Sequence, residues 1–221
     1  MKLRLGYTNQ RELISLYPII NKTIESNLEF DLVYIRGDEL KFKLGEVDLA
    51  FIPLPVLAFI NNIKFISNGA FTINRLGIRL LGNSITRLCI YSSNSTEYYL
   101  FKLLTNFKIP IEIIKDDKEI EKCDAIISYD DYDISIDELW KSQCGDLPIV
   151  ISMLGTIKLQ EELLVKAKVA IRESAVIQER SGNILPYSKE LGLKGRQSID
   201  CFFQLCSKKG LCNSNIKPYI L

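Results

Sequence analysis

Five consecutive small polar residues, Ser92-Ser93-Asn94-Ser95-Thr96, are the most informative chemical feature of the sequence. They follow an apolar segment typical of a strand and precede a segment with the apolar spacing of a helix. Free N–H groups and the dipole at the start of a helix attract anions. Capping the helix needs only one such side chain, so the run predicts a carboxylate-binding site. Ser93, Asn94, Ser95 and Thr96 are the expected contacts.

Three other polar groups lie near the ends of predicted strands. Tyr7-Thr8-Asn9 follows the first strand, where open α/β sheets bind ligands. Ser128-Tyr129-Asp130-Asp131 ends a later strand, and Asn74, next to Arg75, falls in a segment that crosses between two clusters of elements. These residues are candidates for ligand contact, although turns and solvated loops have a similar composition.

The chain contains no histidine, which excludes several kinds of chemistry within it. Ser-His-Asp and Cys-His nucleophiles, a histidine base and His-ligated zinc all require that residue. The sequence also has neither a GxGxxG nor a GxxxxGK[ST] phosphate loop. We therefore expect no metal and no cofactor.

The elements that must position the candidates begin with an alternation of strand and helix. We expect strands at 2–7, 30–36 and 47–53 and helices at 9–24 and 37–44. This order favours parallel pairing with helices on both faces of the sheet. Farther along, we expect strands within 63–81 and at 88–91, 109–114, 124–129 and 147–153, and helices at 96–106, 115–122, 134–143, 158–180 and 198–208.

The two clusters of strands and helices predict an α/β protein of two lobes. Residues 1–72 and 157–221 would form lobe 1, and residues 73–156 would form lobe 2. Strands rather than a flexible linker join the clusters. Lobes joined in this way leave a cleft, which is a preferred place for a ligand.

Composition narrows the class of partner. The 221 residues include 28 Lys+Arg and 27 Asp+Glu, and this balance argues against a nucleic-acid binder. The first residues lack the apolar core of a signal peptide, and no apolar run is long enough to span a bilayer. We expect a cytoplasmic protein, monomeric or homodimeric, whose partner is a small molecule rather than nucleic acid or a membrane.

The six cysteines form no close CxxC pair. They are expected to be small buried hydrophobic residues with at most one disulfide among them. Cys201 and Cys206 are expected to share one helix but to lie on different faces of it.

Several segments, in this order, resemble the menaquinone-biosynthesis family that contains chorismate dehydratase and 1,4-dihydroxy-6-naphthoate synthase. Residues 47–53, VDLAFIP, resemble its "VDxxLxP" strand, and residues 93–96 resemble its "SxTS" strand-to-helix element. Residues 124–127, DAII, are similar to its "DAxLxIGD" strand, and residues 137–150 to its "DLxxEWxxxTGLPFVF" segment. The resemblance covers most of residues 1–155 and implies the type 2 periplasmic-binding-protein fold.

The departures from that family bear on activity. The naphthoate synthase branch is expected to use a histidine, so the resemblance favours the chorismate dehydratase branch. The "YLN" signature of that branch is only approximated by Tyr7-Thr8-Asn9, and its "IGD" is replaced by Ser128-Tyr129-Asp130.

Two functional hypotheses follow from the resemblance. The first is a lyase that eliminates water from a cyclic carboxylate, with Asp130 or the substrate's own carboxylate as base and Asn9 orienting the leaving hydroxyl. Tyr7, Thr8, Asn74, Tyr129 and the residues of the 93–96 run would bind the substrate. The second is a non-catalytic solute-binding protein for a small carboxylate. A third, in which apolar side chains close the cleft and the protein acts only in assembly, is motivated by Leu54, Pro55 and Leu154.

Overall fold

The computed structural model describes residues 1–213 and 216–221. The strands are β1 Lys2–Tyr7, β2 Glu29–Tyr34, β3 Leu49–Pro53, β4 Lys64–Phe65, β5 Phe71–Ile73, β6 Gly77–Leu80, β7 Leu88–Ile90, β8 Ile111–Ile113, β9 Ala125–Ser128, β10 Ile134–Ser135, β11 Ile149–Thr156 and β12 Tyr219–Ile220. The α-helices are α1 Tyr17–Ile20, α2 Leu40–Lys43, α3 Thr96–Leu104, α4 Asp137–Cys144, α5 Glu161–Arg180, α6 Pro186–Lys189 and α7 Gly192–Lys208. The 3-10 helices are η1 Gln10–Leu16, η2 Leu44–Glu46, η3 Leu54–Ala58 and η4 Asp117–Lys122.

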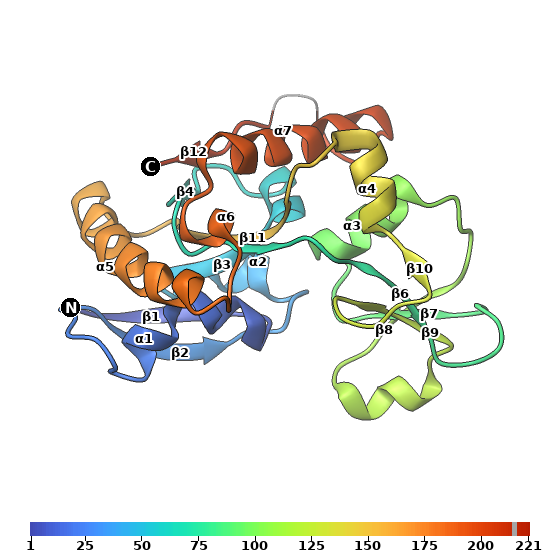
Figure 1. The fold of residues 1–221 in the computed structure, drawn as a ribbon, viewed down its shortest axis with the longest axis horizontal. Coiled ribbons are helices and arrows are strands. Elements are labelled where there is room, and N and C mark those ends of the chain that lie inside the picture. The colour runs from blue at the N-terminus through green and yellow to red at the C-terminus, as the bar shows by residue number, and fades with distance from the viewer. Residues whose placement is uncertain (214–215) are drawn as a thin grey trace.

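The described strands form two sheets, which lie side by side in Figure 1. In the larger sheet the order is β12-β4-β11-β3-β1-β2, and β5 also pairs with β11. β1 pairs in parallel with both β2 and β3, which confirms the parallel arrangement expected for the first three strands. β11 runs antiparallel to β3, β4 and β5.

The smaller sheet has the order β10-β6-β9-β7-β8. The chain enters it between β5 and β6 and returns through α4 to β11 (Figure 1). β11 belongs to the residues expected to form lobe 2, 73–156, but it pairs with strands of the larger sheet. The division into lobes at 72/73 and 156/157 stays a prediction.

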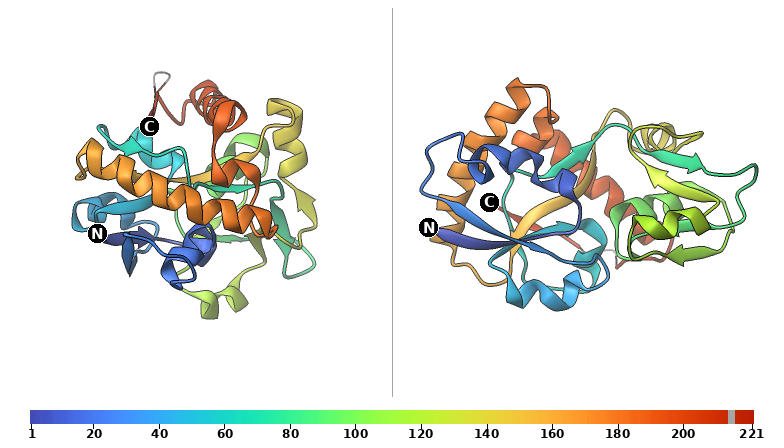
Figure 2. Two further views of the ribbon diagram at one scale, coloured as in Figure 1. Left: turned by 60° about the vertical axis from the view of Figure 1, so that its left-hand side comes forward. Right: turned by 90° about the horizontal axis from the view of Figure 1, so that it is seen from below.

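Helices cover both faces of the larger sheet, as Figure 2 shows for α5 on one face and α2 on the other. Leu164, Ala167 and Ile171 of α5 share one buried core with residues of η1, α1, β1 and β3. Every residue of β3 and β11 is buried, as expected for strands covered on both faces. No helix of the described residues is long and apolar enough to cross a membrane.

The segment between β1 and β2 differs from the single helix expected over residues 9–24. It forms η1 followed by the short α1, which begins at Tyr17 with Pro18 next to it. Proline has no N–H to donate to the carbonyl four residues earlier, so an α-helix cannot pass unbroken through Pro18.

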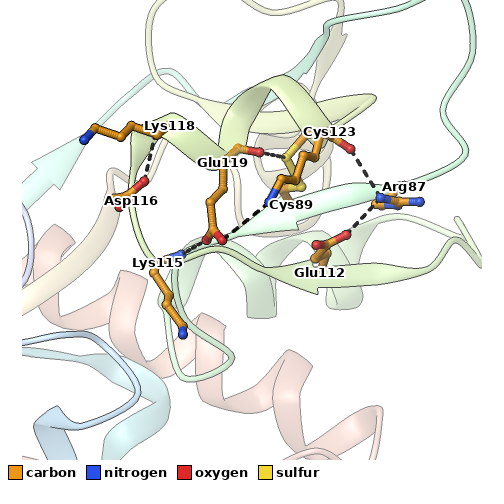
Figure 3. A network of polar contacts seen from close by, with 9 residues as sticks. Arg87, Cys89, Glu112, Lys115, Asp116, Lys118, Glu119 and Cys123 are labelled. Carbon is orange, nitrogen blue, oxygen red and sulfur yellow. Dashed lines mark hydrogen bonds and ion pairs between the residues drawn. A yellow bond between two sulfur atoms is a disulfide. The ribbon is translucent and has the colours of Figure 1, made fainter.

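All six cysteines are paired, which corrects the expectation of at most one disulfide. The bonds join Cys89 to Cys123, Cys144 to Cys201 and Cys206 to Cys212. Figure 3 shows the first of them, between β7 and the end of η4. The tertiary structure brings together cysteines that are 34 and 57 positions apart, and their spacing in the sequence does not reveal such pairs.

Candidate functional site

A cavity of about 370 Å³ lies between the two sheets. Residues that end or directly follow β1, β2, β3, β7, β8 and β9 line it, together with the first turn of α3 and one residue of β11. These include Thr8, Asn9, Glu12, Tyr34, Arg36, Pro53, Tyr91, Ser92, Ser95, Glu97, Lys115, Tyr129 and Ile151. A cavity of this size is large enough for a small organic molecule.

The residues predicted after β1 have separate positions. Thr8 and Asn9 line the cavity, whereas the Tyr7 ring packs edge-on against the Tyr34 ring, with the ring centres 5.7 Å apart. The Asn9 side chain also accepts a hydrogen bond from the Arg11 amide at 2.9 Å and caps η1. Thr8 and Asn9 therefore combine a local structural role with access to the cavity.

The polar run before α3 bonds mainly to the protein itself. The Asp38 carboxylate accepts hydrogen bonds from the Ser92 hydroxyl at 2.9 Å and from the Ser93 amide and hydroxyl at 2.9 and 3.0 Å. Gly37 permits this approach, because a Cβ there would lie 2.5 Å from the Cβ of Ser92. The Ser95 hydroxyl caps α3 at the Tyr98 amide.

Only part of this run reaches the cavity. Ser92 and Ser95 line it, whereas Ser93, Asn94 and Thr96 are not among its lining residues. Asn94 and Thr96 are buried. The predicted ligand contacts in this run are thus divided between the cavity and the structural support behind it.

Thr96 ties the start of α3 to the larger sheet. Its hydroxyl, fully buried, donates to the Ile151 carbonyl at 2.5 Å and accepts from the Leu54 amide at 3.0 Å. Thr96→Val keeps the shape but leaves both partners unsatisfied, so we expect a loss of about 1–3 kcal/mol in the free energy of unfolding. Urea denaturation measures it. Thr86→Val is the matched control, because Thr86 is exposed and its hydroxyl donates to Asp124, which water can replace. An equal loss in both variants would contradict a special role for Thr96.

A second cavity, of about 280 Å³, shares Glu12 and Tyr129 with the first. Asn74 and Asp130 line this smaller cavity and not the larger one. Asp130 forms an ion pair with Arg11, with a 3.4 Å contact between Nη1 and Oδ1, and this guanidinium lowers the pKa of Asp130. The structure thus separates Asp130 from Asn9, the other residue predicted to be catalytic.

Glu12 is a buried ionisable group in the lining of the larger cavity. Its side chain is 2% exposed, and one carboxylate oxygen accepts from the amides of Thr8 and Asn9 at 2.8 and 3.1 Å. The other oxygen accepts from the Ser152 hydroxyl at 2.7 Å. Burial outweighs these hydrogen bonds, and it raises the pKa of Glu12 from 4.5 to about 7. A carboxyl group with this pKa can exchange a proton near neutral pH.

Glu97 and Tyr129 interact beside Glu12. The Tyr129 hydroxyl donates to the Glu97 carboxylate. Burial raises the pKa of Glu97, although hydrogen bonds from Tyr129, from its own backbone amide and from Ser95 lower it. Burial and the two nearby acids, Glu97 and Glu12, raise the pKa of Tyr129 well above its ordinary value. Tyr129 therefore stays a neutral hydrogen-bond donor.

The sequence matches no protein-family model, and no curated protein is significantly similar to it. Solved structures resemble the fold. Protein AF1704 from Archaeoglobus fulgidus superposes with a TM-score of 0.79 and 14% identity, over 95% of this chain and 98% of that one. The CA3427 gene product of Candida albicans is described as having the generic periplasmic binding protein structural fold. It superposes with a TM-score of 0.58 and 12% identity, over 100% of this chain and 97% of that one.

The alkanesulfonate-binding protein SsuA from Xanthomonas axonopodis pv. citri, bound to MOPS, gives a TM-score of 0.60 at 12% identity over 100% of this chain and 98% of that one. These matches, with two sheets joined by crossing segments, decide the fold. The chain has the type 2 periplasmic-binding-protein fold. This is the fold that the resemblance to the menaquinone-biosynthesis family implies, and the larger cavity lies between its two sheets.

Within this fold, sequence reasoning missed the ionisable residues of the cleft. Glu12 had a local signal, because Asn9 and Glu12 have the spacing of a capping box, and the structure forms that box. Glu97 also had one, as an acid in the first turn of a predicted helix. Arg36 and Lys115 had only their positions after predicted strands. Among the described residues, no three acidic or thiol side chains gather as a metal site.

Proposed function

We propose that this protein binds a small cyclic carboxylate in the cleft between its two sheets and eliminates water from it, as a chorismate-dehydratase-like lyase. The observation that carries this proposal is Glu12, a buried carboxyl group in the cavity lining with a pKa of about 7. Elimination needs a base near one ring carbon, and this chain has no histidine to supply it. Glu12 takes the ring proton and the C–O bond breaks. The hydroxyl takes up a proton and leaves as water, and the ring becomes aromatic.

The lining also offers groups that suit a carboxylate. Arg36 and Lys115 bring positive charge, and Thr8 and Ser95 bring hydroxyl groups. In this proposal Asn9, which lines the cavity, orients the substrate. Asp130 is a weaker candidate for the base than Glu12, because its pairing with Arg11 lowers its pKa and it lines the other cavity.

The cytoplasmic location expected from the sequence stays a prediction. The three disulfides are typical of an oxidising compartment or of the cytoplasm of a hyperthermophile.

Purified protein incubated with chorismate tests the proposed reaction. We expect loss of the ultraviolet absorbance of chorismate well above the spontaneous rate, with formation of an aromatic enolpyruvyl product seen by chromatography. Heat-denatured protein is the control. A rate equal to the spontaneous one at millimolar chorismate would contradict the lyase.

A second candidate is a non-catalytic solute-binding protein. It is favoured by the likeness of the fold to SsuA, which binds an alkanesulfonate. A thermal-shift panel of aromatic and cyclic acids separates the two. Ligand at about 100 times its Kd stabilises the folded state by about 2.7 kcal/mol, which gives a readable shift. Stabilisation by chorismate without turnover would favour the solute-binding protein.

A further inference from the structure

The loop before α3 leaves little room for a ligand's carboxylate. The Asp38 carboxylate already accepts hydrogen bonds from the hydroxyls of Ser92 and Ser93 and from the Ser93 amide. Glu97 accepts from its own amide and from Ser95. The side chains of Asp38 and Glu97 therefore already use the donors that would hold a ligand's carboxylate at the start of α3.

The acidic and the basic residues of the larger cavity come from different parts of the fold. Arg36 follows β2 and Lys115 follows β8, and each of these strands is at the edge of its sheet. Glu12, by contrast, bonds to Ser152 of the interior strand β11, and Glu97 bonds to Tyr129 after the central strand β9. Asp117 also lines the edge side, and Arg36 pairs with Glu39 at 3.7 Å. The edge side of the cavity thus holds its two basic residues, Arg36 and Lys115, and the interior side holds Glu12 and Glu97.

We infer that Glu97 is the acid that protonates the leaving hydroxyl of the substrate. In this orientation the hydroxyl faces the start of α3, and the carboxylate of the substrate faces Arg36 and Lys115. This inference rests on the proposed elimination. Glu12 accepts the ring proton, the C–O bond breaks, and the hydroxyl takes the proton of Glu97 to leave as water. Proton transfer from Glu12 back to Glu97 restores both groups, so atoms and charges balance.

The surroundings of Glu97 suit this role. Burial favours its protonated form, and the nearby Glu12 makes a second negative charge unfavourable. Tyr129 donates to one oxygen of Glu97 and holds the side chain in place. The titratable groups next to Glu97 are Tyr129 and Glu12. The guanidinium carbon of Arg11 lies 5.2 Å from the centre of the Tyr129 ring.

Glu97→Gln tests the assignment, with Glu138→Gln, an exposed acid of α4, as the matched control. We expect kcat for chorismate to fall by about 100-fold or more in Glu97→Gln, whereas the Kd from thermal shifts stays within about threefold. The alkaline limb of the kcat–pH profile should disappear with Glu97. An analogue with fluoride as leaving group, which needs less protonation, should recover most of the lost rate.

Arg36→Gln tests the orientation of the substrate and does not depend on the folding of the Glu97 variant. We expect its Kd for chorismate to rise by about tenfold or more with kcat changed little. If the wild type turns chorismate over, two results would overturn this inference and leave the proposed function standing. They are an unchanged kcat in folded Glu97→Gln and an unchanged Kd in Arg36→Gln. Absence of turnover in the wild type would overturn the proposed function itself.

Discussion

Replacing Cys144 and Cys201 together by serine should lower the free energy of unfolding by about 4 kcal/mol. This disulfide ties α4, which follows the smaller sheet, to α7 and closes a loop with a sequence separation of 57. In the chain-entropy model, a longer closed loop removes more conformational freedom from the unfolded chain. Urea denaturation of the oxidised wild type and of the variant measures the difference.

The Cys206–Cys212 disulfide provides the matched control. Its sequence separation is 6, so the corresponding double serine variant should lose only about 2 kcal/mol. A loss as large as that of the Cys144–Cys201 variant would contradict the loop-length argument.

Titration of the unreduced wild type with a thiol reagent should find no reactive cysteine, because all six are paired.

Glu12→Gln should remove a pH dependence of stability worth about 3 kcal/mol. The pKa of Glu12 is about 7 in the folded protein and 4.5 in its ordinary state. Between these values the folded protein holds a proton that the unfolded chain has released. The stabilisation is therefore full below pH 4.5 and is lost as the pH rises to about 7. Glutamine stays neutral, so the variant lacks this slope.

The measurement is urea denaturation of both proteins between pH 5 and pH 8. The wild type should lose stability relative to Glu12→Gln as the pH rises through this window. Glu97 and Tyr129 face Glu12 in both proteins, so the difference reports the titration of Glu12 together with its coupling to Glu97. Asp130→Asn is a control without a slope in this window, because Arg11 lowers the pKa of Asp130 from its ordinary 3.8 and its contribution is lost only at lower pH. A parallel pH dependence in wild type and Glu12→Gln would contradict the raised pKa.

Much of the fold was predictable because each element has a local signature. The apolar runs of β3 and β11 predicted strands, and the spacing of apolar residues over 158–180 predicted the helix α5. The strand β12 was missed, since two residues carry too little periodicity to be recognised.

The cleft was predicted less completely. Thr8, Asn9, Ser95 and Tyr129 were expected near a ligand and do line the larger cavity, because the carboxyl ends of their strands meet there. Glu12 and Glu97 were missed. Their burial depends on segments far apart in the sequence, such as Ser152 for Glu12.

The sequence by itself determined most of the order of strands and helices, the absence of histidine chemistry and the likeness to a periplasmic-binding-protein fold. These features depend on residue type and short-range spacing. Only the tertiary structure decided that Asp38 bonds to Ser93, that Cys144 bonds to Cys201 and that Glu12 is buried with a raised pKa. Such pairings and desolvation arise when the crossings between the two sheets bring distant segments together, and no local pattern in the chain specifies them.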